Sequence, residues 1–121
     1  MNPTIYEQLG AENLALLVEK FYELVLQDET IRHLFQTDMN VVKQKQLLFL
    51  TQFLGGPTLY NETFGHPRMR MRHMPHRIDE NAAIAWLSCM NQAIDTLDID
   101  EKLKTTLFNC FPKLAAHMIN A

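Results

Sequence analysis

The spacing of apolar residues is the feature that most constrains how this chain can fold. Apolar side chains recur every three or four positions along most of the sequence, which is the repeat of an amphipathic helix. The clearest stretch covers roughly a 100° arc of a helix wheel and comprises Leu14, Leu17, Val18, Phe21 and Val25. The best two-residue alternation, at 68–73, is too short to found a sheet and is interpreted as a short helix or an irregular arm. The sequence therefore predicts an all-α fold of about five or six helices.

Capping residues divide this pattern into separate helices. Asp38 is expected to cap a helix that runs to about Leu54, while Asp79 and Asp100 are expected to cap the last two long patterns. Asp28 is a possible cap for a short helical turn at 30–35. Each of these acidic side chains can accept a hydrogen bond from an unpaired backbone N–H in the first turn.

Glycine and proline mark where the helices are interrupted. Three of the four glycines and two of the five prolines fall between Gly55 and Pro67, which predicts one long irregular loop. Pro112 lies inside the last helical pattern and is expected to kink or break it, because proline lacks the backbone N–H that the helix interior needs.

Length and composition limit the class of protein. A chain of 121 residues is expected to form a single domain over 1–121, and a net charge of −3 argues against a nucleic-acid-binding domain. Two cysteines cannot make a disulfide framework, which favours a reducing compartment. The apolar runs are too short for a membrane span, and the first residues show no export signal. We therefore expect a cytoplasmic domain that binds neither membrane nor nucleic acid.

Three side chains with polar tips fall on predicted apolar helix faces. They are Tyr22, Gln46 and Trp86, and each requires a hydrogen-bond partner if it is buried. Singly, each is more often a core residue satisfied by a neighbouring group. Together they indicate a polar-lined pocket inside an apolar bundle.

Basic residues and histidines cluster between 66 and 77. Arginines at 68, 70, 72 and 77 form either a solvated arm or an anion site. A zinc site would draw on His66, His73 and His76, but Pro75 disturbs their spacing and the stretch 66–77 contains no cysteine or acidic residue. A single imidazole from this group would suffice as an axial haem ligand.

Several motifs occur together in an order that resembles the group II truncated, or two-on-two, haemoglobins of bacteria, over residues 5–120. They are KQKQ at 43–46, FLTQFLGGP at 49–57, GHP at 65–67, RMRH at 70–73, AWLSCM at 85–90 and HM at 117–118, with Phe21-Tyr22 and Leu34-Phe35 at matching intervals. The resemblance implies a truncated globin fold: a two-on-two helical sandwich with a long loop before a short proximal helix.

The resemblance also assigns roles to individual residues. It implies haem b (iron protoporphyrin IX) as cofactor, with His73 as the metal ligand. It implies a distal ligand-binding set of Tyr22, Gln46 and Trp86. The remaining cofactor contacts that it implies are Phe35 at the haem edge, Lys45, Arg72 and Tyr60 near the propionates, and Val42 at the ligand entry position. Relatives often carry a small or hydroxylated residue where Val42 stands. Valine cannot form a hydrogen bond to the ligand, so stabilisation is expected to come from the other distal residues. Its branched side chain is also expected to narrow the route by which the ligand reaches the haem.

These roles predict a protein that binds dioxygen and other diatomic ligands reversibly and releases them slowly. The resemblance leaves open whether it acts in peroxide or nitric-oxide chemistry with an unidentified reductase, and the expected assembly is a monomer or weak dimer. Two other hypotheses remain: a small helical interaction module whose arginine-rich arm binds an acidic partner or nucleic acid, and a histidine-ligated metal enzyme. Cys89 is expected to be packed in the core.

Overall fold

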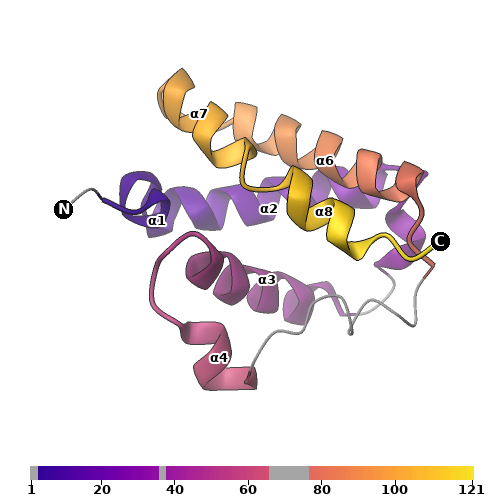
Figure 1. The fold of residues 1–121 in the computed structure, drawn as a ribbon, viewed down its shortest axis with the longest axis horizontal. Helices are drawn as coiled ribbons and strands as arrows, with labels where there is room; N and C mark the ends of the chain where they lie inside the picture. The colour runs from indigo at the N-terminus through magenta and orange to yellow at the C-terminus, as the bar shows by residue number, and fades with distance from the viewer. Residues whose placement is uncertain (1–2, 36–37, 66–76) are drawn as a thin grey trace.

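The fold is that of a helical bundle, as a computed structural model shows (Figure 1). The structure describes residues 3–35, 38–65 and 77–121. Within these residues no strand is present. The elements are α1 (Ile5–Leu9), α2 (Ala11–Gln27), the 3-10 turn η1 (Arg32–Leu34), α3 (Met39–Phe53), α4 (Leu59–Phe64), α6 (Glu80–Asp95), α7 (Glu101–Phe108) and α8 (Pro112–Met118). The all-α prediction is therefore confirmed.

Helices α2 and α6 form the centre of the bundle. Helix α2 packs against both α3 and α6, while α6 packs against α7 and α8 (Figure 1). The five apolar residues predicted on one face of α2 are all buried. They meet residues from α3, α6 and the α7–α8 segment that are also almost fully buried, namely Leu50, Met90, Ile94, Leu107 and Phe111. This arrangement is the expected two-on-two sandwich.

The predicted caps are present at the starts of three long helices. A side-chain oxygen of Asp38 accepts from the backbone N–H of Asn40 at 2.9 Å, Asp79 from Ala82 at 2.8 Å and Asp100 from Leu103 at 2.7 Å. Each cap of this kind contributes about 1 kcal/mol to stability. Asp28 accepts from the N–H of Thr30 at 2.8 Å, but it does not cap the short helical turn as expected, because η1 begins after Ile31 and has no side-chain cap.

Pro112 breaks the last helical pattern, as predicted. Helix α7 ends at Phe108, and Pro112 is the first residue of α8. The first position of a helix tolerates proline because its N–H would have no intrahelical partner there. None of the helices in the described part of the chain has the length and apolar character needed to cross a membrane.

The prediction of an irregular loop from Gly55 to Pro67 was wrong for part of that segment, because α4 lies within it. Two hydrogen bonds tie α4 to the end of α3: the Gln52 side chain donates to Asn61 Oδ1 at 3.1 Å and accepts from the Asn61 backbone N–H at 3.0 Å. A helix of six residues is too short to show a helical repeat in sequence. Its stability comes from these tertiary contacts, which the sequence pattern does not reveal.

The two glycines after α3 allow the chain to turn sharply beside α1. Gly55 has a φ of +96°, and a Cβ atom at this position would lie 2.8 Å from Thr4 Cβ. A Cβ atom at Gly56 would lie 2.7 Å from the Tyr6 ring. Larger residues at either position would push α1 away from the bundle.

We predict that Gly55→Ala destabilises the fold by about 2–3 kcal/mol, because it combines backbone strain with steric overlap. Gly65→Ala is the matched control: Gly65 also has a positive φ, +78°, but a Cβ atom there would have no neighbouring atom within 4 Å. Urea unfolding of both variants measures the difference. Equal losses of stability would show that the contact with Thr4 carries no cost.

Candidate functional site

Tyr22 places a hydroxyl inside the apolar bundle. The residue is only 3% exposed, and its ring makes edge-to-face contacts with Phe21 at 4.9 Å and with Phe35 at 5.8 Å between centroids. The structure gives its hydroxyl no hydrogen bond to another residue in the described ranges. Burial raises the pKa of the Tyr22 phenol above its ordinary value of 10.0. The side chain is therefore a neutral donor held by aromatic packing.

Trp86 lies on the same side of the bundle as Tyr22 because α2 and α6 pack together. Its ring is half-buried and contacts Phe21 at 5.1 Å and Phe111 at 5.7 Å between centroids. Phe21 thus contacts both Tyr22 and Trp86 and fixes their rings relative to each other. Sequence reasoning did not single out Phe21 or Phe111 as site residues, since both read only as ordinary apolar core positions.

Gln46 and Val42 stand one helical turn apart on α3. Both are half-buried, whereas Phe49 and Leu50, which follow on the same helix, are buried. Gln46 has no hydrogen bond to any residue that the structure describes. Its amide thus resembles the Tyr22 hydroxyl, which also has no hydrogen-bond partner among the described residues. Phe53, the last residue of α3, is 38% exposed.

The three polar groups are of the kinds that a small ligand beside a flat cofactor would require. A phenol hydroxyl, a carboxamide and an indole N–H can all donate hydrogen bonds. Their surroundings are aromatic and aliphatic, which suits the faces of a macrocycle. Polar groups in such surroundings cost free energy unless they find partners, and a bound ligand is one source of such partners.

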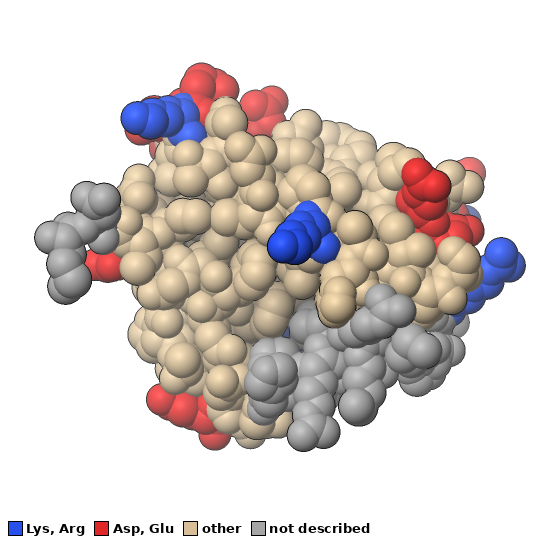
Figure 2. All heavy atoms as spheres, viewed as in Figure 1, with Lys and Arg blue, Asp and Glu red and all other residues tan. Residues whose placement is uncertain are grey.

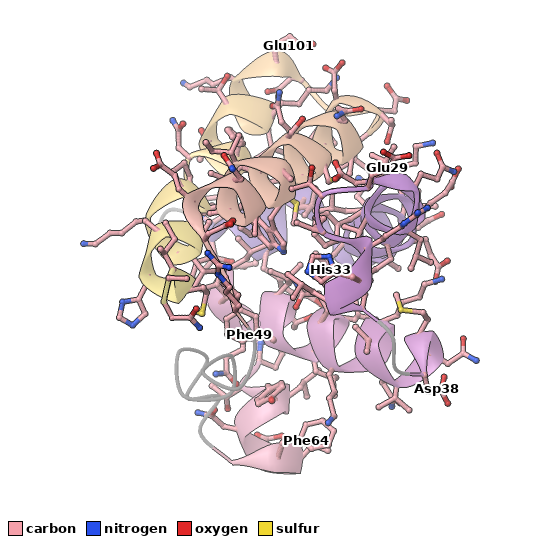
Figure 3. The ribbon with its side chains drawn as sticks, turned by 90° about the vertical axis from the view of Figure 1, so that its right-hand side faces the viewer. Glu29, His33, Asp38, Phe49, Phe64 and Glu101 are labelled. Atoms are coloured by element: carbon pink, nitrogen blue, oxygen red, sulfur yellow. The ribbon has the colours of Figure 1, made fainter. Side chains whose placement is uncertain are left out.

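Three of the other predicted cofactor contacts, Phe35, Tyr60 and Lys45, lie in the described part of the chain. Phe35 is half-buried directly after η1, with its ring against Tyr22. Tyr60 is buried in α4 and its ring contacts Phe49 at 6.1 Å and Phe64 at 5.1 Å. Lys45 Nζ lies 5.2 Å from the centroid of the Phe64 ring (Figure 3 labels Phe49 and Phe64). The propionate contacts expected of Lys45 and Tyr60 remain predictions.

His73 and Arg72 lie outside the described residues, as do His66, His76, Arg68 and Arg70. Their expected roles as iron ligand, propionate partner, zinc ligands or solvated arm are therefore not tested by the structure. In the part of the chain that the structure does describe, no group of three or more His, Cys, Asp or Glu residues could hold a metal ion.

Cys89 is packed in the core, as expected. It is 2% exposed, and its thiol donates to Asp28 Oδ2 at 3.8 Å. Burial, with the nearby Asp28 carboxylate, raises the pKa of the Cys89 thiol to about 11. A thiol that stays protonated at neutral pH is a poor nucleophile. Cys89 thus joins α6 to the end of α2 and carries no reactive chemistry.

The raised pKa of Tyr22 predicts a loss of stability at alkaline pH. Between the ordinary tyrosine pKa and the higher folded-state pKa, the folded protein binds the phenol proton more tightly than the unfolded chain does. The free energy of unfolding should therefore be unaffected below pH 10 and should fall above it, by about 1.4 kcal/mol per pH unit from this one group. Urea unfolding across this pH range measures the slope. Tyr22→Phe should flatten it, and an identical slope in the variant would contradict the assignment.

Comparison with known proteins supports a globin. The sequence pattern of the family described as bacterial-like globin matches residues 4–120. The chain is 43% identical over 115 residues to group 2 truncated hemoglobin YjbI of Bacillus subtilis, covering 95% of this chain and 87% of the relative. It is 37% identical over 119 residues to group 2 truncated hemoglobin 3-1 of Lotus japonicus, covering 95% of this chain and 71% of that one.

Solved structures give the same result. The crystal structure of the group II truncated hemoglobin from Bacillus anthracis superposes with a TM-score of 0.94 at 38% identity, covering 100% of this chain and 94% of the other. The truncated oxygen-avid haemoglobin from Bacillus subtilis gives 0.92 at 42% identity, covering 98% of this chain and 100% of the other. These likenesses confirm the truncated globin fold.

The fold and the site together define a globin-type haem protein. The family pattern covers nearly the whole chain, and relatives above 30% identity align along almost all of it. The chain belongs to the bacterial-like globin family, and its similarity is to the group II truncated haemoglobins. Haem binding follows from the family.

Proposed function

We propose that this chain holds haem b through His73 and binds dioxygen and other diatomic ligands reversibly, with slow release. The observation that carries the proposal is the buried Tyr22 hydroxyl, which has no hydrogen bond to a described residue and is fixed by Phe21 and Phe35. The haem iron, when bound, supplies the position at which a diatomic ligand binds. The protein then determines how long the ligand stays.

The distal residues act as hydrogen-bond donors to the ligand. Donors directed at developing negative charge stabilise it, and they do so more strongly where water is excluded. Tyr22 supplies a hydroxyl from α2, Gln46 an amide from α3 and Trp86 an N–H from α6. Because the pKa of Tyr22 is raised, its hydroxyl keeps the proton that it donates across the physiological range. The Val42 side chain has no hydrogen-bond donor, so it only occupies space at the position where the ligand enters.

The family resemblance supports the remaining assignments. Phe35 would pack against the haem edge, and Lys45, Tyr60 and Arg72 would approach the propionates. A lysine or arginine beside a carboxylate forms a charge-assisted hydrogen bond. The related Bacillus subtilis protein is described as oxygen-avid, which agrees with slow release from a site of this kind.

An absorption spectrum of the purified chain, with and without added haemin, tests the proposal. We expect a Soret band that saturates at one haem per chain. Replacing His73 by glycine should abolish the native spectrum, and free imidazole should restore it by supplying the missing ligand. His33→Gly is the matched control, since His33 is exposed on η1.

Two results would contradict the proposal. One is the absence of a Soret band after reconstitution, which would favour a helical interaction module instead. The other is a native-like spectrum in the His73→Gly variant, which would place the axial ligand elsewhere.

A further inference from the structure

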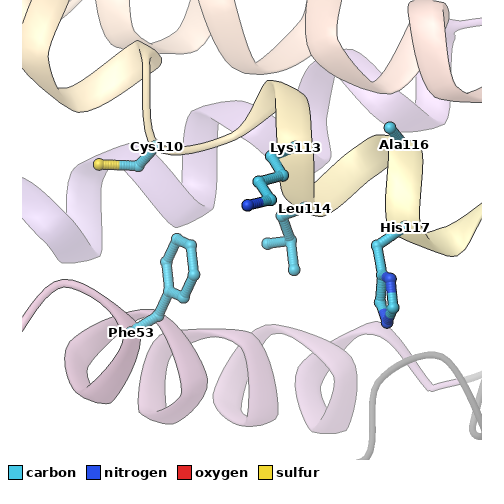
Figure 4. A pocket seen from close by; sticks show the side chains of 6 residues that line it. All are labelled: Phe53, Cys110, Lys113, Leu114, Ala116 and His117. Atoms are coloured by element: carbon cyan, nitrogen blue, oxygen red, sulfur yellow. The ribbon is translucent and has the colours of Figure 1, made fainter.

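A groove of about 600 Å³ lies between the C-terminal end of α3 and helix α8 (Figure 4). Its lining residues are Phe53, Cys110, Lys113, Leu114, Ala116 and His117. None of them belongs to the residues assigned above to haem or its ligand. Its size is within the range of about 300–1,000 Å³ that is typical of pockets for small organic molecules.

One wall of the groove is the partly exposed ring of Phe53, which packs on its inner side against two other aromatic rings. Phe53 stacks on the buried Phe49 at 5.5 Å between centroids and contacts the fully buried Phe111 at 5.9 Å. Its remaining surface, 38% of the residue, is open. Leu114 on α8 faces Phe53 across the groove (Figure 4). The two side chains offer apolar surface suited to an alkyl chain.

The edge of the groove on α8 carries nitrogen-bearing side chains and no carboxylate. Lys113 and His117 are four residues apart, so they lie on one face of the helix. Figure 4 shows the His117 side chain extending from α8 toward α3, while the Lys113 side chain lies next to Leu114 at the start of α8. Lys113 has no ion pair with any described residue, whereas Lys20, Lys43 and Lys104 each pair with an acidic side chain.

The charge around the groove favours a monoanion. The chain as a whole has a net charge of −3, yet no Asp or Glu from the described ranges lines the groove. Among the described residues on the face shown in Figure 2, the acidic atoms lie toward the margins and one basic side chain lies near the centre. An ammonium group can donate a charge-assisted hydrogen bond to a carboxylate.

We propose that this groove binds a medium-chain monocarboxylate, with its alkyl chain against Phe53 and Leu114 and its carboxylate at Lys113. The groove is also linked to the distal site, since Phe53 contacts Phe111 and Phe111 contacts Trp86. Binding here does not depend on the role of Tyr22, Gln46 or Trp86 in ligand release. The groove is a second binding site on the same domain.

Cys110 provides a direct reporter of occupancy. Its half-buried thiol lines the groove, while Cys89 is buried elsewhere and serves as an internal control. Burial raises the pKa of the Cys110 thiol, so alkylation by iodoacetamide is best followed at about pH 9. The probe is decanoate added to the haem-loaded protein, and mass spectrometry gives the rate at each cysteine.

Decanoate should slow Cys110 alkylation in a saturable manner, and salt should weaken its binding. Lys113→Met should weaken the apparent affinity about threefold to fivefold. Lys102→Met, which removes an exposed lysine from α7, should leave it unchanged. Ala116→Phe, which fills the groove from an exposed position, should abolish protection. Decanol and decylammonium, matched in chain length, should protect less.

Four results would overturn the proposal. The first is a rate of Cys110 alkylation that decanoate leaves unchanged. The second is protection by decanol equal to that by decanoate, which would show that the carboxylate is not recognised. The third is an unchanged affinity for decanoate in the Lys113→Met variant. The fourth is protection that accompanies loss of the Soret band, which would show that decanoate had entered the haem site instead of the groove.

Discussion

Dioxygen should leave the haem-loaded protein about fivefold faster when Tyr22 is replaced by phenylalanine, and about fivefold faster when Trp86 is. Each substitution removes one hydrogen-bond donor, and a hydrogen bond of this kind contributes about 1 kcal/mol. From the same values, the double variant should release dioxygen about one to two orders of magnitude faster than the parent. The effect should lie in the dissociation rate, because the donors act on the ligand after it has bound.

Stopped-flow replacement of dioxygen by carbon monoxide measures these rates. Tyr22→Phe is a clean substitution, since the ring that contacts Phe21 and Phe35 is retained and only the hydroxyl is lost. Tyr6→Phe is the matched control: Tyr6 lies in α1, where its ring faces Gly56 rather than the distal site. Unchanged rates in both the Tyr22 and Trp86 variants would refute the proposed donor set.

Removing haem should lower the thermal stability of the protein substantially. A ligand that binds only the folded state stabilises it by about 2.7 kcal/mol when its free concentration is a hundred times its dissociation constant. For a domain of this size, that corresponds to a shift in Tm of about 10 °C. The structural reason is that Phe35, Val42 and Trp86 are only partly buried by protein, so the cofactor would complete their packing.

Circular dichroism melting curves of the apo and haem-loaded forms provide the measurement. The shift should grow with the concentration of free haem, because it arises from binding equilibrium. Equal melting temperatures would contradict the view that the cofactor forms part of the core. The Gly55→Ala variant offers a comparison, since its loss of stability should occur in both forms alike.

Local signals in the sequence were sufficient for most of the helices. Asp38, Asp79 and Asp100 cap where expected because an N-cap depends only on residues two or three positions away. Pro112 ends a helical segment for an equally local reason. Helix α4 was missed because its stability depends on Gln52 and Asn61, which are nine residues apart and have no pattern that pairs them.

The candidate site was only partly predictable. The helical repeat places three side chains with polar ends on apolar helix faces: Tyr22, Gln46 and Trp86. This placement can be predicted for each helix separately. The position of Tyr22 relative to Trp86 depends on Phe21, which contacts both side chains. The groove beside α8 was not foreseen, since Phe53 and Lys113 are sixty residues apart and belong to different helices.

The sequence by itself determined the all-α class, the faces of the main helices and the residues that begin and end them. These features depend on interactions within a few residues, which the helical repeat and the capping rules describe. Only the tertiary structure decided that α4 forms, that Phe21 joins two distal side chains and that α3 and α8 enclose a groove. Those outcomes depend on packing between segments far apart in the chain, whose relative positions no local pattern specifies.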